Sequence, residues 1–393
     1  MFRAVPLFVI VCLAVPTFAQ SPSSNVGNSS SPLQIVYVID GSTLTTYTVD
    51  GQTFQPTQVG MTTLQESVYP DLITSPNGRI LYYTAYQNYS QQGEKLYVYN
   101  TNSLGVPNTQ PIQTLGAKGI YTPLVDPNDK FLYVVHQGTV GTQYTTYTIV
   151  RYVINPATGK ISQPVTEATY KLDSTVSGLY CSLFLDGMNT TGTMLYDAIF
   201  CSYPYGGAEA TYNERSVDPL TGSLGPDQKV YYWNNSSGGG DHVQFVKNLV
   251  FDFVVPNDYQ QNVNFVDIYR VHPNLSTPLI HCTESMLADC GSDSYGLAHP
   301  SAQYVFVVSP ITFMTNIDKV ELNSKQIVAT SSTIPYEVQQ FSPDGKIAYA
   351  ANDVNTALNI QIYGFNVNTA QVTAGGLISV PSDLDSWFPA ERR

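Results

Sequence analysis

The chain has 393 residues and a formal net charge of −13, and only 12% of its residues are charged. It contains no cluster of Lys or Arg, which argues against nucleic-acid binding, because that needs cations along the phosphate backbone. The 29 Tyr, 28 Gly and 25 Pro are typical of many short strands joined by tight turns and are unfavourable for long helices. The composition therefore favours an all-β protein.

The first residues have the three regions of an export signal in the expected order. Arg3 supplies a positive charge, residues 5–15 form an apolar run, and Thr17-Phe18-Ala19 offers a cleavage site. The run is too short to span a bilayer, and no later segment is apolar for long enough. We predict a signal peptide over residues 1–19 and a disordered linker over residues 20–32, with a buried N-terminal strand as the alternative. A secreted or periplasmic location follows.

A turn followed by a strand recurs four times along the chain. The copies begin at Ser75, Asp126, His299 and Ser342, each of which precedes a Pro. The Pro sets φ for the first turn position, and an Asn-Gly or Asp-Gly pair accepts the positive φ that follows. The Tyr, Val and Ile residues after the turn have high β propensity.

A second strand follows each copy, and a hairpin then leads to a last edge strand. The hairpins include those at residues 155–160, 218–223 and 366–371, in which Asn or Asp opens the turn. The order of strand, turn, strand, loop, strand, turn, strand is that of a four-stranded antiparallel blade, the unit of a β-propeller.

The starts of six such units can be placed in the sequence at Tyr69, Tyr121, Tyr180, His242, Tyr295 and Tyr336. Their mean spacing is about 53 residues, which is in the range typical of repeat arrays. Residues 33–59 add an incomplete seventh unit, whose missing strand can come from the tail after Pro381. We therefore predict one seven-bladed β-propeller domain over residues 33–393, closed by a C-terminal latch. Two tandem sandwiches are the alternative, although no linker separates the halves.

Four cysteines follow the predicted signal peptide, and the even number in an exported chain indicates two disulfides. Three connectivities are open, and the short separations favour Cys181–Cys201 and Cys282–Cys290. Neither CxxC nor HxxxH spacing is present to indicate a zinc site. No metal and no cofactor are expected.

The turn-strand repeat, clearest at residues 342–352, and the hairpin at residues 363–374 resemble the lactonase family of seven-bladed propellers. That family includes 6-phosphogluconolactonase-like enzymes and YVTN-type repeats, and the resemblance covers roughly residues 33–381. It implies a propeller fold and a site in the central channel that acts on a lactone or its carboxylate. Motifs of this kind specify a fold better than a chemistry.

Enzymes of the family carry an Arg-His pair followed by a strand that ends in Asn-Glu. The corresponding residues here are Asp241-His242 and Asn257-Asp258, so that His242 matches, while Asp241 replaces the Arg and Asp258 replaces the Glu. The loss of the Arg removes the planar fork that would hold a carboxylate, which argues against an anionic lactone.

Lactone hydrolysis needs a base that activates water and a donor for the oxyanion. His242 is the predicted base, since it is the only His at a unit start, and Asp241 or Asp258 can orient it. Glu337, beside Tyr336, is the candidate general acid. The alternative is that His242 is a hydrogen-bonded, inert side chain in the channel.

Five of the unit starts are tyrosines, and they recur at the same position of their units: Tyr69, Tyr121, Tyr180, Tyr295 and Tyr336. We expect equivalent positions to lie at one end of the channel, where phenol rings can bind a sugar-like ligand. Packing between blades is the alternative role.

The sequence thus predicts a monomer that binds, and hydrolyses, a small sugar-like lactone at the central channel, without nucleic-acid binding or membrane insertion. The alternative is a non-catalytic extracellular or periplasmic scaffold that binds another protein. The missing Arg and Glu favour the scaffold, and His242 favours the enzyme.

Overall fold

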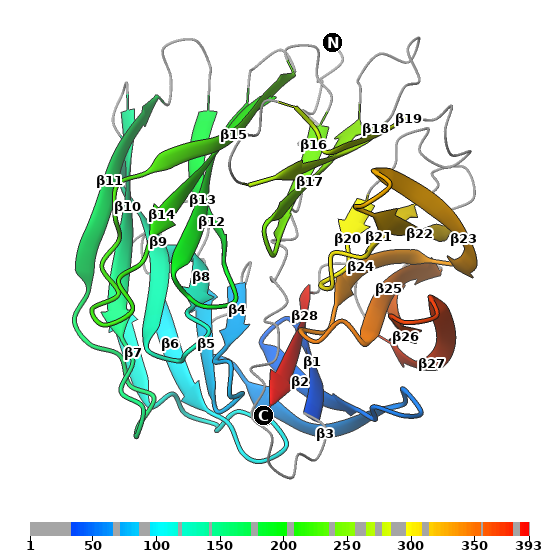
Figure 1. Ribbon diagram of the computed structural model, residues 1–393. Coiled ribbons are helices and arrows are strands. Elements are labelled where there is room, and N and C mark those ends of the chain that lie inside the picture. Colours follow the sequence, from blue (N-terminus) through cyan, green and yellow to red (C-terminus); the bar gives the residue numbers. More distant parts are fainter. Residues whose placement is uncertain are drawn as a thin grey trace, which may run out of the picture.

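The computed structural model describes residues 33–65, 71–85, 95–116, 120–140, 144–173, 180–202, 208–235, 240–255, 265–271, 277–283, 296–308, 314–354, 357–379 and 386–392. In this part of the chain the regular elements are all strands, and they form seven four-stranded antiparallel sheets. The sheets follow one another around a ring in chain order (Figure 1). The predicted all-β, seven-bladed propeller is confirmed.

The seven sheets are numbered here as blades 1–7, with the strands of each given in their order across the sheet. Blade 1 consists of β28 (Ser386–Arg392), β1 (Leu33–Asp40), β2 (Thr43–Val49) and β3 (Pro56–Thr63). Blade 2 consists of β4 (Asp71–Thr74), β5 (Ile80–Ala85), β6 (Lys95–Asn100) and β7 (Gln113–Gly116). Blade 3 consists of β8 (Ile120–Val125), β9 (Phe131–Val140), β10 (Tyr144–Val153) and β11 (Val165–Asp173).

The remaining blades follow the same pattern. Blade 4 consists of β12 (Tyr180–Met188), β13 (Met194–Ser202), β14 (Ala208–Ser216) and β15 (Gln228–Asn235). Blade 5 consists of β16 (Gly240–Val246), β17 (Leu249–Val255), β18 (Phe265–Arg270) and β19 (Ile280–Thr283). Blade 6 consists of β20 (Gly296–Ala298), β21 (Tyr304–Val308), β22 (Thr315–Glu321) and β23 (Gln326–Ile334). Blade 7 consists of β24 (Glu337–Phe341), β25 (Ile347–Val354), β26 (Ala357–Asn366) and β27 (Gln371–Ser379).

The first strand of each blade is the innermost one. These strands meet from blade to blade, since β28 contacts β4, β4 contacts β8, β8 contacts β12, and β20 contacts both β16 and β24. The inner strands of blades 2–7 begin within two residues of the predicted unit starts. All inner strands run in the same direction, so their first residues lie at one end of the central channel.

The ring is closed by the C-terminus, as predicted. Strand β28 pairs antiparallel with β1 along its whole length, from Leu33 opposite Arg392 to Ile39 opposite Ser386. Figure 1 shows this red strand beside the blue first strands of the chain. Joining the two ends of the chain in one blade leaves no open inner edge in the ring.

The repeated turn is held by its own side chains. In blade 7 the Ser342 hydroxyl donates to Asp344 Oδ1 at 2.7 Å, and that oxygen also accepts the backbone N–H of Lys346 at 3.0 Å. Ser75 and Asn77 form the same arrangement in blade 2, with Ser75 Oγ 3.0 Å from Asn77 Oδ1. Side chains that bond the backbone two residues on are the reason why Ser, Asn and Asp recur at these turns.

The hydrophobic core lies between the blades rather than in one centre. Each of the seven pairs of neighbouring blades encloses one apolar cluster. Val36 of blade 1 packs with Tyr349 of blade 7 in the cluster at the chain closure. A strand between two clusters must be apolar on both faces, which explains the fully buried run inside β1.

Many tyrosines join the blades. Tyr37 and Tyr133, each on the second strand of its blade, donate to the carbonyls of Gly105 and Gly222 in the hairpins of the next blade, both at 2.7 Å. Tyr304 repeats the contact at 2.9 Å to a carbonyl of blade 7. These bonds give the high Tyr content a structural role.

The predicted disulfide Cys181–Cys201 is confirmed, and it joins directly opposed residues of β12 and β13. Cys282 is buried in the cluster between blades 5 and 6, while Cys290 lies outside the described residues. The second disulfide therefore stays a prediction, as do the signal peptide and the linker before residue 33. No helix able to cross a membrane occurs in the described residues.

Candidate functional site

The residues predicted to form the site fall at the channel end where the inner strands begin. The structure describes the backbone there for four of them, at or near the first residues of β8, β12 and β16: Tyr121, Tyr180, Asp241 and His242. Three others lie outside the described residues: Tyr69, Asp258 and Tyr295. The topology therefore brings the strands that carry Tyr121, Tyr180 and His242 to one end of the ring.

Tyr336 and Glu337 lie at the start of β24, and both are half-buried. Tyr336 packs against the apolar cluster between blades 6 and 7, and its carbonyl accepts a hydrogen bond from Thr315 Oγ1 at 2.7 Å. For this tyrosine the structure shows packing between blades. Glu337 is the first ladder residue of β24, opposite Ala351.

The charged side chains on the inner strands of blades 2–7 are all negative. These strands contain no Lys or Arg, and they carry four carboxylates: Asp71, Asp186, Asp241 and Glu337. Asp71, Asp241 and Glu337 are the first or second residues of their strands, and so they share the channel end where these strands begin. Carboxylates gathered on these strands create a negative potential, which disfavours anionic ligands.

Three inner strands contain a β-bulge at the same position relative to the turn that follows. The ladder with the second strand shifts between Tyr121 and Leu124 in β8, between Leu185 and Gly187 in β12, and around Gln339 in β24. The ladder skips one residue in each of the bulges of β12 and β24, and it skips two, Thr122 and Pro123, in the bulge of β8. Bulges re-aim side chains and are frequent beside functional sites.

Asp186 is the bulged residue of β12 and is not among the site residues predicted from the sequence. Its Oδ2 atom is buried and has no hydrogen-bond partner among the described residues. Burial and the charge of Asp197 raise the pKa of Asp186 to about 7. The sequence offers one feature that could have pointed to it, an Asp in the otherwise apolar segment of residues 183–188.

Asp197 lies near this residue and accepts hydrogen bonds from three side chains. Arg215 Nε and Asn213 Nδ2 each donate to it at 2.9 Å, and the Tyr170 hydroxyl donates at 3.2 Å. The ion pair with Arg215 is fully buried. Burial raises the pKa of Asp197, and the bonds from Asn213, Arg215 and Tyr170 oppose this rise by favouring the ionised form, whose negative charge acts on Asp186.

The bulges of β8 and β12 are linked. Thr122, in the bulge of β8, has a positive φ of 48°. This conformation is uncommon for a β-branched residue, and such strain is often found near functional sites. The Thr122 hydroxyl accepts the N–H of Leu185 at 3.2 Å, directly before Asp186.

A second polar group lies between blades 4 and 5. Asp252, Asp267 and His281 are opposite one another on β17, β18 and β19. His281 Nδ1 donates to Asp267 Oδ1 at 2.6 Å, Tyr269 donates to Asp267 Oδ2 at 3.0 Å, and Tyr231 of blade 4 donates to Asp252. Burial, followed by the neighbouring carboxylates, raises the pKa values of both tyrosines. These phenols therefore stay protonated as donors.

Two other histidines have structural positions. Burial lowers the pKa values of His136 and His299 to about 4, so both are neutral at pH 7. His299 Nε2 donates to the Gly345 carbonyl at 2.7 Å within a group of aromatic rings. No group of three His, Cys, Asp or Glu side chains in the described ranges is placed to hold a metal ion.

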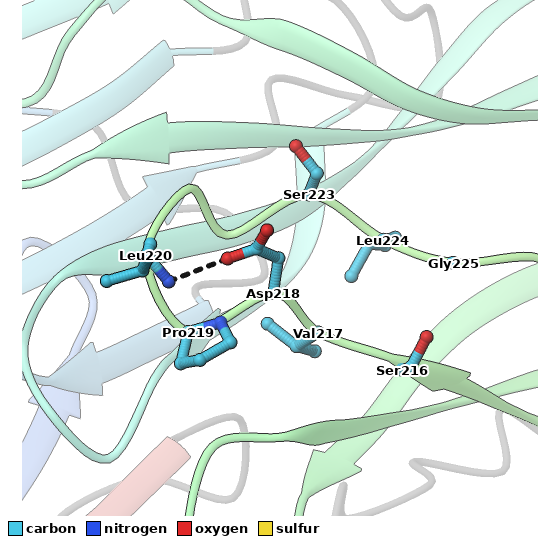
Figure 2. Close-up of a pocket in the computed structure, with 8 residues that line it drawn as sticks. All are labelled: Ser216, Val217, Asp218, Pro219, Leu220, Ser223, Leu224 and Gly225. Carbon is cyan, nitrogen blue, oxygen red and sulfur yellow. Dashed lines mark hydrogen bonds between the residues drawn. The ribbon is translucent and has the colours of Figure 1, made fainter.

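A surface hollow of about 520 Å³ lies at the hairpin after β14. Figure 2 shows its lining, residues 216–220 and 223–225, with Asp218 turned toward its own loop. The Asp218 carboxylate accepts the N–H groups of Leu220 and Thr221 at 2.8 and 3.1 Å, which lowers its pKa. The hollow is therefore a feature of the hairpin turn, with a carboxylate that is already bonded.

No protein-family model matches the chain, and no curated protein matches it by sequence. Solved structures match by fold. A "putative 6-phosphogluconolactonase" from Bacteroides fragilis has a TM-score of 0.55 and 13% identity, over 93% of this chain and 100% of its own. One from Bacteroides uniformis has a TM-score of 0.54 and 14% identity, over 90% and 99%. A protein from Lactobacillus plantarum has a TM-score of 0.51 and 11% identity, over 91% and 100%.

Likeness at this level of identity shows the fold, and it confirms the propeller architecture that the resemblance to the lactonase family implies. The class of protein is thus a seven-bladed propeller with the architecture of the lactonase-like structures. The chemistry has to be argued from the residues of this chain.

Proposed function

We propose that this protein is an exported, monomeric propeller that binds a neutral, hydroxyl-rich small molecule in its central channel and hydrolyses a sugar lactone there. The observation that carries the proposal is the charge of the inner strands. In blades 2–7 they hold four carboxylates and no cation, so a phosphorylated or carboxylated ligand would be repelled. An uncharged sugar lactone would not be repelled in this way.

His242 is the proposed base of the reaction. It lies on the inner strand β16 directly after Asp241, at the channel end where Tyr121 and Tyr180 also begin their strands. Neutral imidazole can take a proton from water as the water oxygen bonds to the lactone carbonyl carbon. Collapse of the tetrahedral intermediate then breaks the ring ester bond, and the proton passes to the leaving hydroxyl.

Export is supported by the order of charge, apolar run and cleavage site at the N-terminus and by the disulfide Cys181–Cys201. Disulfides persist in secreted and periplasmic compartments and are rare in the cytosol. Fractionation of cells that express the full chain tests this part of the proposal. Protein retained at full length in the cytosol would contradict it.

Activity is tested by measuring the hydrolysis of glucono-1,5-lactone and of its 6-phosphate, each corrected for spontaneous opening. We expect kcat/KM to be higher for the neutral lactone and to fall by about 100-fold or more in His242→Ala, because general-base catalysis contributes about 10²–10⁴-fold. Asp241→Arg, which restores the family residue, is expected to shift the preference toward the phosphorylated lactone. Full activity of His242→Ala, or turnover of neither lactone, would overturn the enzymatic proposal and favour the scaffold.

A further inference from the structure

The bulge of β12 gives one carboxylate a position that the repeat does not require. Blades 3, 4 and 7 share this bulge, yet its residues differ: Thr122 with Pro123 in β8, Asp186 in β12 and Gln339 in β24. The bulge itself does not require an acidic side chain, because other residues occupy it in blades 3 and 7. Asp186 therefore calls for an explanation of its own.

Asp186 lies on β12, the innermost strand of blade 4, beside the central channel. Blade 4 is covered on one face by the cluster with blade 3 and on the other by the cluster with blade 5, and β13 covers the outer edge of β12. Asp186 is nevertheless only half-buried. The one side of an innermost strand that remains open is the side facing the channel axis.

One of the two carboxyl oxygens of Asp186 forms no hydrogen bond with the described residues. Oδ2 is buried without a hydrogen-bond partner in the described part of the chain, whereas the nearby Asp197 is bonded by three side chains. Buried polar atoms without partners are rare in folded proteins, and each needs a reason, such as a binding role. The charged Asp197 and the burial favour the protonated form of Asp186, which can both donate and accept a hydrogen bond.

We propose that Asp186 is a ligand-contacting residue of the central channel, and that its carboxyl group binds a hydroxyl of a neutral, hydroxyl-rich molecule. A hydroxyl also donates and accepts at once, so the two groups match. Gln339 occupies the same bulge position of blade 7, three blades further round the ring, and is half-buried. It supplies a second polar contact from the opposite side of the channel. This inference rests on the ligand class of the proposed function.

The test measures binding of glucono-1,5-lactam, the amide analogue that lactone hydrolysis does not consume, by calorimetry from pH 5.5 to 8.5. For Asp186→Ala we expect about 10-fold weaker binding at pH 6, where the wild-type carboxyl is protonated; this corresponds to the loss of one good hydrogen bond, which Asp186→Asn would keep because an amide also donates and accepts. The wild-type affinity should fall as the pH rises through 7, and Asp186→Asn should remove this pH dependence. Circular dichroism checks the fold of each variant.

Asp218→Asn is the matched control. It makes the same change from Asp to Asn in the same blade, and Asn155 and Asn366 already occupy the equivalent turn position in blades 3 and 7. We expect its affinity to be unchanged. Equal affinities and equal pH profiles for Asp186→Asn and Asp218→Asn would overturn the role of Asp186, as would the absence of lactam binding by the wild type.

His242→Ala separates this inference from the proposed function. If the lactam binds to His242→Ala with wild-type affinity while hydrolysis is lost, both proposals stand. If the wild type binds the lactam through Asp186 but hydrolyses no lactone, only the catalytic proposal fails. If the wild type hydrolyses the lactone and Asp186→Ala binds the lactam with wild-type affinity, only the role of Asp186 fails.

Discussion

Blade 5 presents two unlike faces to its neighbours. Toward blade 6, Phe251, Phe253 and Ile268 join an apolar cluster in which every side chain is buried. Toward blade 4, the alternate positions of the same strands hold Asp252 and Asp267, which are only 2% and 6% exposed. Both faces are buried between blades, so position in the fold alone does not explain the difference.

The polar face needs more partners than the apolar one. Asp252 and Asp267 are directly opposed on antiparallel strands, where like charges destabilise. Tyr231, Tyr269 and His281 each donate to one of the two carboxylates and offset this cost. The apolar face tolerates any well-filled volume, whereas the polar face depends on each hydrogen bond.

The largest effect is expected on the apolar face. Phe251→Ala removes a side chain with no exposed surface and leaves a cavity between blades 5 and 6. We expect the free energy of unfolding to fall by about 3–5 kcal/mol, measured by urea denaturation at pH 7. A loss below about 1 kcal/mol would show that the two blades pack loosely and would remove the contrast between the faces.

The next effect concerns blade 4, which supplies Tyr231 to the polar face. The Cys181–Cys201 bond spans a sequence separation of 20 residues in that blade. Replacing both cysteines by Ser should cost about 3 kcal/mol through the larger entropy of the unfolded chain. Denaturation of oxidised wild type and of the double variant in the same buffer measures this, and equal midpoints would contradict it.

On the polar face, Asp267→Asn removes one acceptor oxygen and leaves Tyr269 or His281 without its bond. We expect a loss of about 1–3 kcal/mol in unfolding free energy. Asp267→Asn combined with His281→Ala should be less destabilising than the sum of the single changes, because the two residues share one bond. Strict additivity would show that the 2.6 Å contact contributes no stability.

Asp186 lies beside Tyr196, in the interface between blades 4 and 5. Its contribution to the free energy of unfolding should change with pH in the opposite direction to that of an acid in an ion pair. Its folded pKa of about 7 lies above the usual value of an unfolded Asp, so its burial destabilises the fold increasingly as the pH rises from about 4 to 7. Asp186→Asn should therefore be more stable than the wild type at pH 8 and equal to it at pH 4. The full difference in pKa would give about 4 kcal/mol at pH 8, and we expect about 1–2 kcal/mol because solvent screens the half-buried side chain. Thermal unfolding at both pH values tests this, and an equal gain at pH 4 would contradict it.

The smallest effect is expected at the surface. Leu220, in the hairpin after β14, is 85% exposed. Leu220→Ser should change the unfolding free energy by less than about 0.5 kcal/mol, which sets the baseline for the comparison of the two faces. A larger loss would mean that the hairpin hollow is packed against another part of the protein.

The sequence by itself determined the repeat and therefore the fold. The turn that begins at Ser342 carries its own hydrogen bonds, so its recurrence at Ser75 and Asp126 marks the same local structure each time. Six unit starts and the incomplete unit at residues 33–59 gave the number of blades, and the missing strand of that unit pointed to the C-terminal latch. Local chemistry is sufficient for features of this kind.

Only the tertiary structure decided which polar side chains come together. Asp252, Asp267 and His281 meet because of the register of three strands, and the partner Tyr231 comes from another blade. Asp186 stands out because a bulge removes it from the ladder and because Asp197 lies near it. Register and bulges follow from contacts distant in sequence, and one displaced residue changes which face a side chain occupies. The candidate site at His242 came from sequence, whereas the role of Asp186 came from the fold.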